Sequence, residues 1–573
     1  MSLPTYLAAR TSQYAAQHET FSNIRQHFNP GTGVGMPDEM LIRARIQLLS
    51  WFPWSDIVCS VDATERILFK MVKTYTHEFN TKLYKGEVSF KTGLFINGEW
   101  VDPVDGGDMI DVIDPATGKV ITAVAGGNTK DVDIAVKAAR KAFKTTWGLK
   151  VPGSERGNIL SRLADLLEKH SDELTALECL NVGKPFAGAR QLEIPAAVYV
   201  SRYFAGWADK IHGKTIETNE KKFAYTRHEP WGVVGAIVPW NGPLVSAAMK
   251  IAPALATGNT VVLKPSEITP FTALYLADLL NEAGVPPGVV NIVNGYGLTV
   301  GSAISLHPNV DKITFTGSIL TGRKILKAAA ESNLKNVTLE LGGKSPTIIF
   351  DDVDLEQAIK WAAYGVYFNM GQVCVAGSRI YVHEAIYDKF LDGFTNFAKG
   401  LTSATGAPFA EGTQHGPQVS KTQFDRVMGY INSGISEGAK VHVGGERSSD
   451  EGYFIKPTIF VDAKPSMKIM QEEIFGPVCS IVKFKSEEEV TEWANDTTYG
   501  LAANVFTQNS ARAIRMSHAL EAGTINVNCS LSMELNVPFG GYKQSGMGRE
   551  LGQEALDTYT QVKAVHVNIG QAL

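Results

Sequence analysis

The chain has 573 residues, of which 44% are hydrophobic and 20% charged, and its formal net charge is −5. This composition is ordinary for a globular protein, and the length allows several large cores. It gives no basic stripe that would favour nucleic acid as a partner, and no apolar run reaches the roughly 20 residues that a membrane-spanning helix needs.

Five cysteines are scattered along the chain: Cys59, Cys179, Cys374, Cys479 and Cys529. An odd, scattered set does not predict a disulfide framework, and this favours a reducing compartment. The sequence has no CxxC pair and no HExxH motif, so we expect no metal site. We expect a cytoplasmic protein, with a mitochondrial location as the alternative.

Residues 1–84 are predicted to form an N-terminal extension that is poorly ordered or peripheral. Residues 1–70 contain a Gly/Pro stretch and the cluster Trp-Phe-Pro-Trp at 51–54, and a methionine that could serve as a later start follows at Met71. The extension is interpreted as a loosely attached segment, as the product of a seldom-used upstream start, or as a transit peptide. Glu19 and the scarcity of arginine count against the transit peptide, so the first two interpretations are favoured.

Helical and strand-like segments alternate after Phe95. Thr129 is the predicted N-cap of one helix because apolar residues then recur at helical spacing, and Ser154 is predicted to open a second. Proline and glycine bracket a third helix at 270–283. Short apolar runs predict buried strands at 233–238, 260–263, 289–293, 313–315 and 337–339. This alternation predicts a mainly parallel sheet, and a second such region runs from about residue 345 to residue 558.

Two segments alternate in the manner of exposed strands, residues 222–230 and 565–569. Exposed strands invite pairing with another chain. They are predicted to form either an oligomerisation element or a plain edge hairpin.

Polar side chains and glycines follow the predicted strands of the first region. Lys264 and Glu267 come directly after the strand at 260–263, and glycine loops follow the strands at 289–293 and 313–315. Ligands of parallel sheets bind just past the carboxyl ends of strands, and helix amides there can face a pyrophosphate. We therefore expect a dinucleotide site. Glu267 would repel a ribose phosphate, so NAD is favoured over NADP, although Lys264 could accept the phosphate.

A thiol and a carboxylate lie in two glycine-containing runs near the middle of the chain. Cys374 lies in FNMGQVCVAGSR (368–379), and Glu340 lies in TLELGGKSP (338–346). A thiolate can attack a carbonyl and carry the acyl group as a thioester, so the pair predicts covalent catalysis with a base nearby. These motifs resemble the catalytic signatures of the NAD(P)-dependent aldehyde dehydrogenases, over about residues 85–570.

This resemblance implies an α/β fold with two parallel-sheet, Rossmann-like domains and a β-strand oligomerisation element. The implied division is an NAD-binding domain at 85–210 and 231–342, an oligomerisation element at 211–230 and 558–573, and a catalytic domain at 343–557. The chain would then assemble as a homodimer or homotetramer.

The resemblance also implies a reaction. Cys374 attacks an aldehyde, and the side-chain amide of Asn241 and the backbone N–H of Cys374 stabilise the thiohemiacetal oxyanion. Hydride passes to NAD, and Glu340 activates the water that hydrolyses the thioester. We expect burial at a strand end to raise the pKa of Glu340. Lys250 matches a position that helps to order the site, but a surface lysine would look the same.

Further positions are implied to bind the cofactor, including the glutamate and phenylalanine of the EIFGP motif at 473–477. The full predicted set is Ile237, Pro239, Trp240, Lys264, Ser266, Glu267, Gly297, Gly301, Gly317, Ser318, Glu473 and Phe475.

The predicted substrate tunnel departs from the family pattern at two places. Gly242 and Met249 stand where aromatic residues are common, which should widen the tunnel and favour bulky apolar aldehydes such as arylacetaldehydes. The predicted lining is Gly242, Val245, Ser246, Met249, Phe368, Val373, Val375, Met533 and Phe539.

Three other functions compete with NAD-dependent oxidation of aldehydes to acids. In a CoA-acylating enzyme the thioester passes to a thiol, but the presence of Glu340 favours hydrolysis. An inactive scaffold protein of the same fold would have no need of Asn241, Glu340 and Cys374 together. A thiol esterase would have no need of the nucleotide motifs.

Overall fold

The computed structural model of the protein describes residues 72–573, so the interpretations of residues 1–70 lie outside the described residues. The described part begins with a hairpin of β1 (Thr74–Asn80) and β2 (Lys85–Lys91). Phe79 and Phe90 of this hairpin are buried in one cluster with Phe186 and Phe271. Residues 74–84 of the predicted extension form a defined hairpin, and the burial of its aromatic residues fixes it to the body of the fold.

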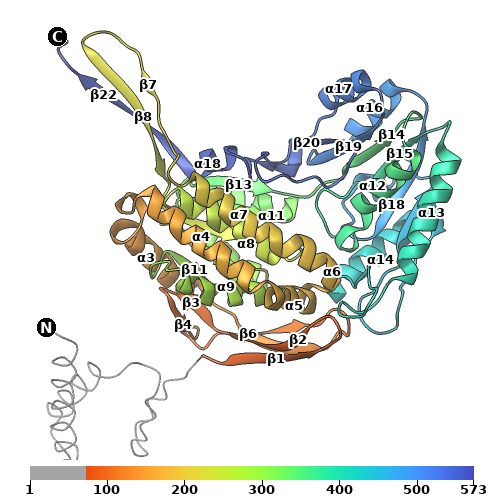
Figure 1. Ribbon diagram of the computed structural model, residues 1–573, viewed down its shortest axis with the longest axis horizontal. Coiled ribbons are helices and arrows are strands. Elements are labelled where there is room, and N and C mark those ends of the chain that lie inside the picture. Colours follow the sequence, from red (N-terminus) through yellow and green to blue (C-terminus); the bar gives the residue numbers. More distant parts are fainter. Residues whose placement is uncertain (1–71) are drawn as a thin grey trace, which may run out of the picture. The chain divides into compact units, whose positions relative to one another are not determined.

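An eight-stranded sheet forms the first layer, in the order β21-β13-β12-β9-β10-β11-β3-β4 (Figure 1). Five neighbouring strands are parallel, and all five were predicted from their apolar runs. They are β9 (Val233–Ile237), β10 (Thr260–Lys264), β11 (Val290–Ile292), β12 (Lys312–Thr316) and β13 (Asn336–Glu340). The antiparallel edges are β3 (Leu94–Ile96) with β4 (Glu99–Val101) on one side and β21 (Gly546–Met547) on the other.

Helices cover this sheet, and their apolar faces form its core. They are α3 (Thr129–Thr145), α4 (Gly153–Lys169), α5 (Ser171–Val182), α6 (Phe186–Gly188), α7 (Ile194–Trp207), α8 (Pro243–Ala256), α9 (Phe271–Glu282), α10 (Ser302–Leu306) and α11 (Ile319–Glu331). The predicted N-cap of α3 is one residue late. Asn128 is the cap, because its side chain accepts from the Asp131 N–H while Asp131 accepts from the Asn128 N–H, which completes a capping box. The second helix likewise begins one residue before Ser154.

A second sheet has seven strands, in the order β16-β17-β18-β15-β14-β19-β20, and all but β16 are parallel. The strands are β14 (Pro346–Ile349), β15 (Arg379–His383), β16 (Lys440–Val443), β17 (Thr458–Val461), β18 (Val478–Phe484), β19 (Ala502–Phe506) and β20 (Thr524–Val527). Its helices are α12 (Leu355–Tyr367), α13 (Tyr387–Ser403), α14 (Lys421–Ser436), α15 (Lys468–Gln471), α16 (Glu487–Asn495) and α17 (Ser510–Ala519). The predicted α/β fold with two parallel-sheet domains is confirmed.

A three-stranded antiparallel arm projects from the body (Figure 1). It contains β7 (Thr215–Ile216), β8 (Lys222–Pro230) and β22 (Thr560–Asn568), and β8 pairs with β22 along its whole length. The two exposed strands predicted from alternation are thus partners in one sheet. A smaller antiparallel pair, β5 (Met109–Ile113) with β6 (Val120–Ala125), completes the strands.

The C-terminal part of the predicted catalytic segment, 343–557, returns to the first sheet. β21 pairs with β13, so Leu339 and Glu340 face Met547 and Gly546 across the ladder. α18 (Glu554–Tyr559) follows and leads into the arm. The predicted end of the catalytic domain at residue 557 therefore differs from the structure. The chain returns from the second sheet to the first before that point, at β21. No helix in the part of the chain that the structure describes is long and apolar enough to cross a membrane.

Candidate active site

A cavity of about 1090 Å³ opens at the carboxyl ends of the first sheet's strands. The chain proceeds from β9 outward through β10 and β11 on one side, and then places β12 and β13 on the other. This reversal is a topological switch point, where parallel sheets bind ligands. Every predicted catalytic, cofactor and tunnel residue lines this one cavity except Lys250.

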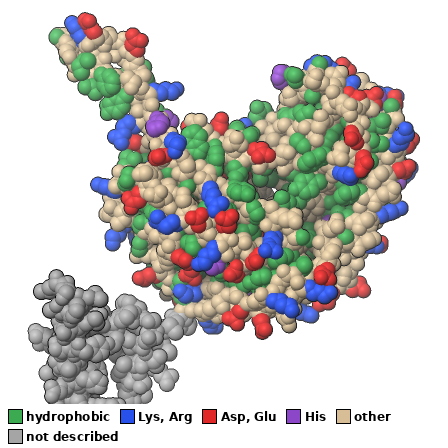
Figure 2. All heavy atoms as spheres, in the orientation of Figure 1, with side chains coloured by type: hydrophobic (Ala, Val, Ile, Leu, Met, Phe, Trp, Pro, Cys, Tyr) green, Lys and Arg blue, Asp and Glu red, His purple; other side chains and the backbone are tan. Residues whose placement is uncertain are grey.

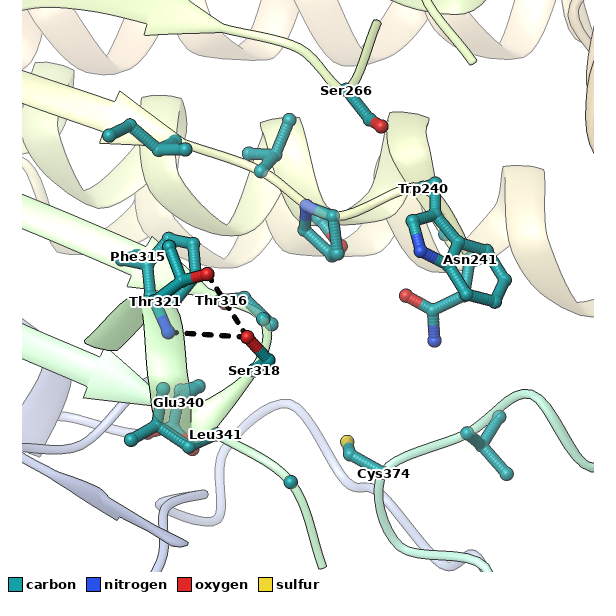
Figure 3. Close-up of a pocket in the computed structure, with 18 of the residues that line it drawn as sticks. Trp240, Asn241, Ser266, Phe315, Thr316, Ser318, Thr321, Glu340, Leu341 and Cys374 are labelled. Atoms are coloured by element: carbon teal, nitrogen blue, oxygen red, sulfur yellow. Dashed lines mark hydrogen bonds between the residues drawn. The ribbon is translucent and has the colours of Figure 1, made fainter. Parts of the chain in front are cut away.

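Cys374 lies between α12 and β15, and its sulfur faces the cavity opposite the amide of Asn241 (Figure 3). Burial raises the pKa of the Cys374 thiol to about 12, and the charges of Glu473 and Glu340 act in the same direction. The resting nucleophile is therefore a protonated thiol. Attack on a carbonyl requires a group that takes this proton.

The amide of Asn241 is held by the loop that carries Cys374. Its Nδ2 donates to the Gln372 carbonyl at 2.9 Å, which leaves its second N–H for a ligand. Asn369 supports this arrangement, because its own Nδ2 donates to the carbonyls of Asn241 at 3.1 Å and Gln372 at 3.3 Å. Asn369 has a φ of 48°, a left-handed conformation that asparagine tolerates better than most residues. Sequence reasoning missed Asn369.

Glu340 is the last residue of β13, where its carboxyl group enters the cavity. Neither carboxyl oxygen has a hydrogen-bond partner among residues 72–573. Burial raises the pKa of Glu340 well above its usual range, and the charge of Glu550 adds to this effect. The direction of this shift is the one that the strand-end position predicted. Such a carboxyl group keeps its proton to a higher pH than a solvent-exposed glutamate does, and it can exchange that proton with a water molecule or the thiol.

Lys250 is fully buried in α8, which excludes the alternative of a surface lysine. Its Nζ pairs with the carboxylate of Glu550 and lies 3.2 Å from Thr314 Oγ1. Glu550 lines the cavity and Lys250 does not, so Lys250 touches the cavity lining through its pairing with Glu550. Glu550 was missed in the sequence, where the glycines of SGMGRE (545–550) were the only local signal.

The nucleotide half of the cavity is built from strand ends and one helix N-terminus. Lys264 Nζ donates to Glu267 Oε2 at 3.0 Å, and burial lowers the pKa of this lysine. Ser318 caps α11 by accepting from the Thr321 N–H at 3.3 Å, so the first turn of this helix faces the cavity (Figure 3). The other glycine loop differs from the prediction, because residues 297–301 form a π-helical turn before the short α10.

Glu473 reaches the same cavity from the second domain. Its Oε1 accepts from the Gly343 N–H at 3.0 Å, and burial raises its pKa to about 7. A Cβ on Gly342 would overlap the Glu473 carboxylate, so only glycine lets the carboxylate lie this close to the backbone at position 342. The ring of Phe475 packs edge-on against Trp240, with centroids 5.1 Å apart. The carboxylates of Glu267 and Glu473 and the N-terminus of α11 line one cavity, a set of groups that fits a dinucleotide.

The remaining part of the cavity lies beyond Cys374 and is mostly apolar. Val245, Met249, Phe368 and Phe539 line it, and Gly242 adds no side chain to the wall. Sequence reasoning also missed Glu193, a carboxylate in this wall that no local motif marks.

Comparisons with known proteins agree with this geometry. The aldehyde dehydrogenase family profile matches residues 100–565. An aldehyde dehydrogenase of Agaricus bisporus is 58% identical, over 87% of this chain and 99% of its own. The mitochondrial aldehyde dehydrogenase of Homo sapiens is 52% identical, over 84% of this chain and 93% of its own.

A solved structure supports the same conclusion. The NAD⁺ complex of an aldehyde dehydrogenase from Bacillus cereus superposes with a TM-score of 0.82 at 49% identity, covering 84% of this chain and 97% of that one. The sequence match spans both domains and the arm. The chain belongs to the aldehyde dehydrogenase family.

Proposed function

We propose that this enzyme, an NAD-dependent aldehyde dehydrogenase, oxidises aldehydes to carboxylic acids through an acyl group held on Cys374. One observation carries the proposal. A buried thiol, an amide with a free N–H and a carboxyl group of raised pKa line one cavity together with a nucleotide-sized cradle.

Each residue has a chemical role in this reaction. The Cys374 thiol gives its proton to the Glu340 carboxylate, which releases it to solvent, and the sulfur bonds to the aldehyde carbon. The free N–H of Asn241 and the backbone N–H of Cys374 stabilise the oxyanion. NAD, when bound, supplies the acceptor for the hydride that leaves this carbon. Glu340 removes a proton from the water that then attacks the thioester, which releases the acid and restores the thiol. Lys250 is a positioning residue that holds Glu550 beside Glu340.

NAD use over NADP is favoured by the pair at the end of β10. Glu267 accepts from Lys264, so its carboxylate stays in the cavity and offers acceptors to ribose hydroxyls. The same negative charge repels a ribose phosphate, and Lys264 is already engaged.

Bulky or aromatic aldehydes are the proposed substrates. Gly242 places no side chain in the tunnel, and the flexible Met249 stands where a rigid ring would narrow it. Single pocket contacts change specificity by about 1–3 kcal/mol, so we expect a broad range of substrates.

The test is reduction of NAD by purified enzyme with a panel of aldehydes, repeated with NADP and with CoA. We expect NAD reduction faster with phenylacetaldehyde than with acetaldehyde, no requirement for CoA, and no activity in Cys374→Ala. Glu340→Gln should give a burst of reduced NAD followed by slow turnover, since acylation survives and hydrolysis does not. NAD reduction that persists in Cys374→Ala would contradict the mechanism.

Assembly and location are proposed on separate grounds. The exposed strands of the arm favour a homodimer or homotetramer. The four cysteines among residues 72–573 are free thiols, which favours the cytoplasm, with mitochondria as the alternative. Fractionation of cells that produce the tagged protein tests the location.

A further inference from the structure

A cluster of three charged side chains lies in the wall of the aldehyde half of the cavity. Lys184 Nζ lies 2.8 Å from Glu178 Oε1 and 2.9 Å from Glu193 Oε2. The side chains of Glu178, Lys184 and Glu193 are only 0%, 6% and 11% exposed. Of the three, Glu193 lines the cavity. The cluster contains two carboxyl groups and one ammonium group, so its ionised form carries a net negative charge next to the tunnel.

The second carboxylate oxygen of Glu193 is not satisfied by the protein. Oε1 is buried, and no donor among residues 72–573 lies within hydrogen-bond distance of it. Leaving a buried acceptor without a donor is unfavourable, and more so for a charged group. A ligand that brought an N–H or O–H to this oxygen would remove that penalty.

Gly242 explains why this oxygen belongs to the tunnel wall. A Cβ on Gly242 would lie 2.8 Å from Glu193 Oε1, closer than a real Cβ approaches an oxygen. The carboxylate therefore occupies the place that a side chain at position 242 would take. The absence of a side chain at position 242 therefore makes this part of the tunnel wall a hydrogen-bond acceptor.

The rest of the wall at this level is mostly apolar, with Val245 and Met249 near Gly242, and the Ser246 Oγ lies 3.8 Å from where a Cβ on Gly242 would stand. A substrate tail that passes these residues meets two polar groups, the Ser246 hydroxyl, which can donate or accept, and the Glu193 carboxylate, which can only accept. An aldehyde with a donor at the matching point of its tail gains a charge-assisted hydrogen bond, and an apolar tail of the same shape leaves the carboxylate unpaired.

We propose that Glu193 is a specificity-determining residue that selects, among bulky aldehydes, those whose tails carry an O–H or N–H donor. This inference rests on the proposed aldehyde oxidation and names the substrate class within it. Phenolic and indolic arylacetaldehydes and aldehydes with an amino group at the far end belong to this class.

Isosteric substrate pairs test the proposal. The specificity constant kcat/KM is measured for para-hydroxyphenylacetaldehyde and divided by the constant for its para-methyl analogue. The same ratio is taken for the meta-substituted pair, because a para and a meta substituent place the hydroxyl at two different depths in the tunnel. One hydrogen bond to a charged group is expected to give a ratio of about 10 to 100 for at least one pair. In Glu193→Gln, which keeps the shape and removes the charge, that ratio should fall at least about threefold. In Glu193→Asp, which withdraws the carboxylate, it should also fall.

Gly242→Ala provides a coupled test. Its Cβ displaces the carboxylate in the wild-type background, so it should lower the hydroxyl-to-methyl ratio there. In the Glu193→Gln background, where the preference is already reduced, it should lower the ratio much less. A ratio taken within each variant cancels any general loss of activity or folding.

Two outcomes overturn the inference: a wild-type ratio below about 3 for both pairs, or a ratio of any size that Glu193→Gln leaves unchanged. Either result leaves aldehyde oxidation itself intact, because both members of each pair are still oxidised. Failure of the proposed function is distinguishable, since no aldehyde of any kind would then reduce NAD.

Discussion

Two carboxyl groups oppose ionisation of the Cys374 thiol, and Glu473 has the larger effect. Glu473 is also predicted to hold a cofactor ribose, so one side chain links the nucleotide half of the site to the nucleophile. Its own pKa of about 7 means that it carries its charge above neutral pH. The reactivity of the thiol should then depend on a residue from a different segment of the chain.

Glu473→Gln should make Cys374 more reactive in the enzyme without cofactor. Glutamine keeps an oxygen for the Gly343 N–H but removes the charge, so the pKa of the thiol falls and more thiolate is present at a given pH. We expect alkylation by iodoacetamide at pH 8.5 to accelerate roughly threefold to tenfold, where one pKa unit corresponds to tenfold.

The alkylation rate as a function of pH checks this prediction, with mass spectrometry to locate the label. Cys374→Ala serves as the control for the other thiols, of which Cys179 and Cys479 are buried. If the alkylation of Glu473→Gln needed the same pH as the wild type, or a higher one, the electrostatic account would be contradicted.

Sequence patterns predicted cavity residues that lie in recognisable motifs and missed those whose place depends on distant parts of the chain. Cys374, Glu340 and Asn241 lie in recognisable runs, and the structure brings them to one cavity. Glu550 is distant in the chain and reaches Glu340 only because β21 pairs with β13. Glu193 likewise has no local signature, since its role depends on the absence of a side chain at Gly242.

At the scale of elements, the turn after β13 joins the two halves of the site. Glu340 ends the strand, and Gly342 and Gly343 follow at once, so the backbone can pass against Glu473 and the Cys374 carbonyl. Buried strands of this kind were predicted well, because each is a short apolar run between turn residues. Helix starts were less well predicted, because Asn128 and Thr129 are both good caps and only the reciprocal bond to Asp131 decides between them.

Gly342→Ala should weaken cofactor binding without unfolding the protein. The new Cβ would overlap the Glu473 carboxylate. Because this carboxylate is the flexible end of a side chain, we expect it to move aside and the backbone to stay in place. NAD would then lose the charge-assisted hydrogen bond that Glu473 is predicted to make with its ribose. We expect this loss to raise the Kd for NAD roughly tenfold to a hundredfold.

Calorimetric titration of NAD into the variant measures this change, and thermal unfolding checks the fold. Gly400→Ala is the matched control, because a Cβ there, within α13, meets no atom within 4 Å. The control should bind NAD normally and gain up to about 1 kcal/mol in stability from helix propensity. Equal NAD affinity in Gly342→Ala and the wild type would show that Glu473 does not hold the cofactor.

At the scale of the whole molecule, the arm stands out because its strand β22 keeps hydrophobic side chains exposed and does not pack them into the core. β8 and β22 alternate in sequence, yet most side chains of β22 are exposed, and hydrophobic residues gather on the arm (Figure 2). Val562 is 63% exposed and Val567 39%. Sequence alternation predicted the strands, but which surface covers them is a property of an assembly and not of one chain. Such an open edge favours pairing with another copy.

The double variant Val562→Asp/Val567→Asp should reduce the assembly to single chains. Two charges on the open strand oppose burial against a partner, because an unpaired carboxylate is costly to desolvate. Sedimentation should then give a mass near 62.1 kDa in place of a multiple of it. The cavity contains no residue of β7, β8 or β22, so NAD binding by the single chain should persist. Leu334→Asp, at an exposed turn on the body, is the control and should keep the wild-type mass. A double variant with the wild-type mass would show that the arm does not hold the assembly together.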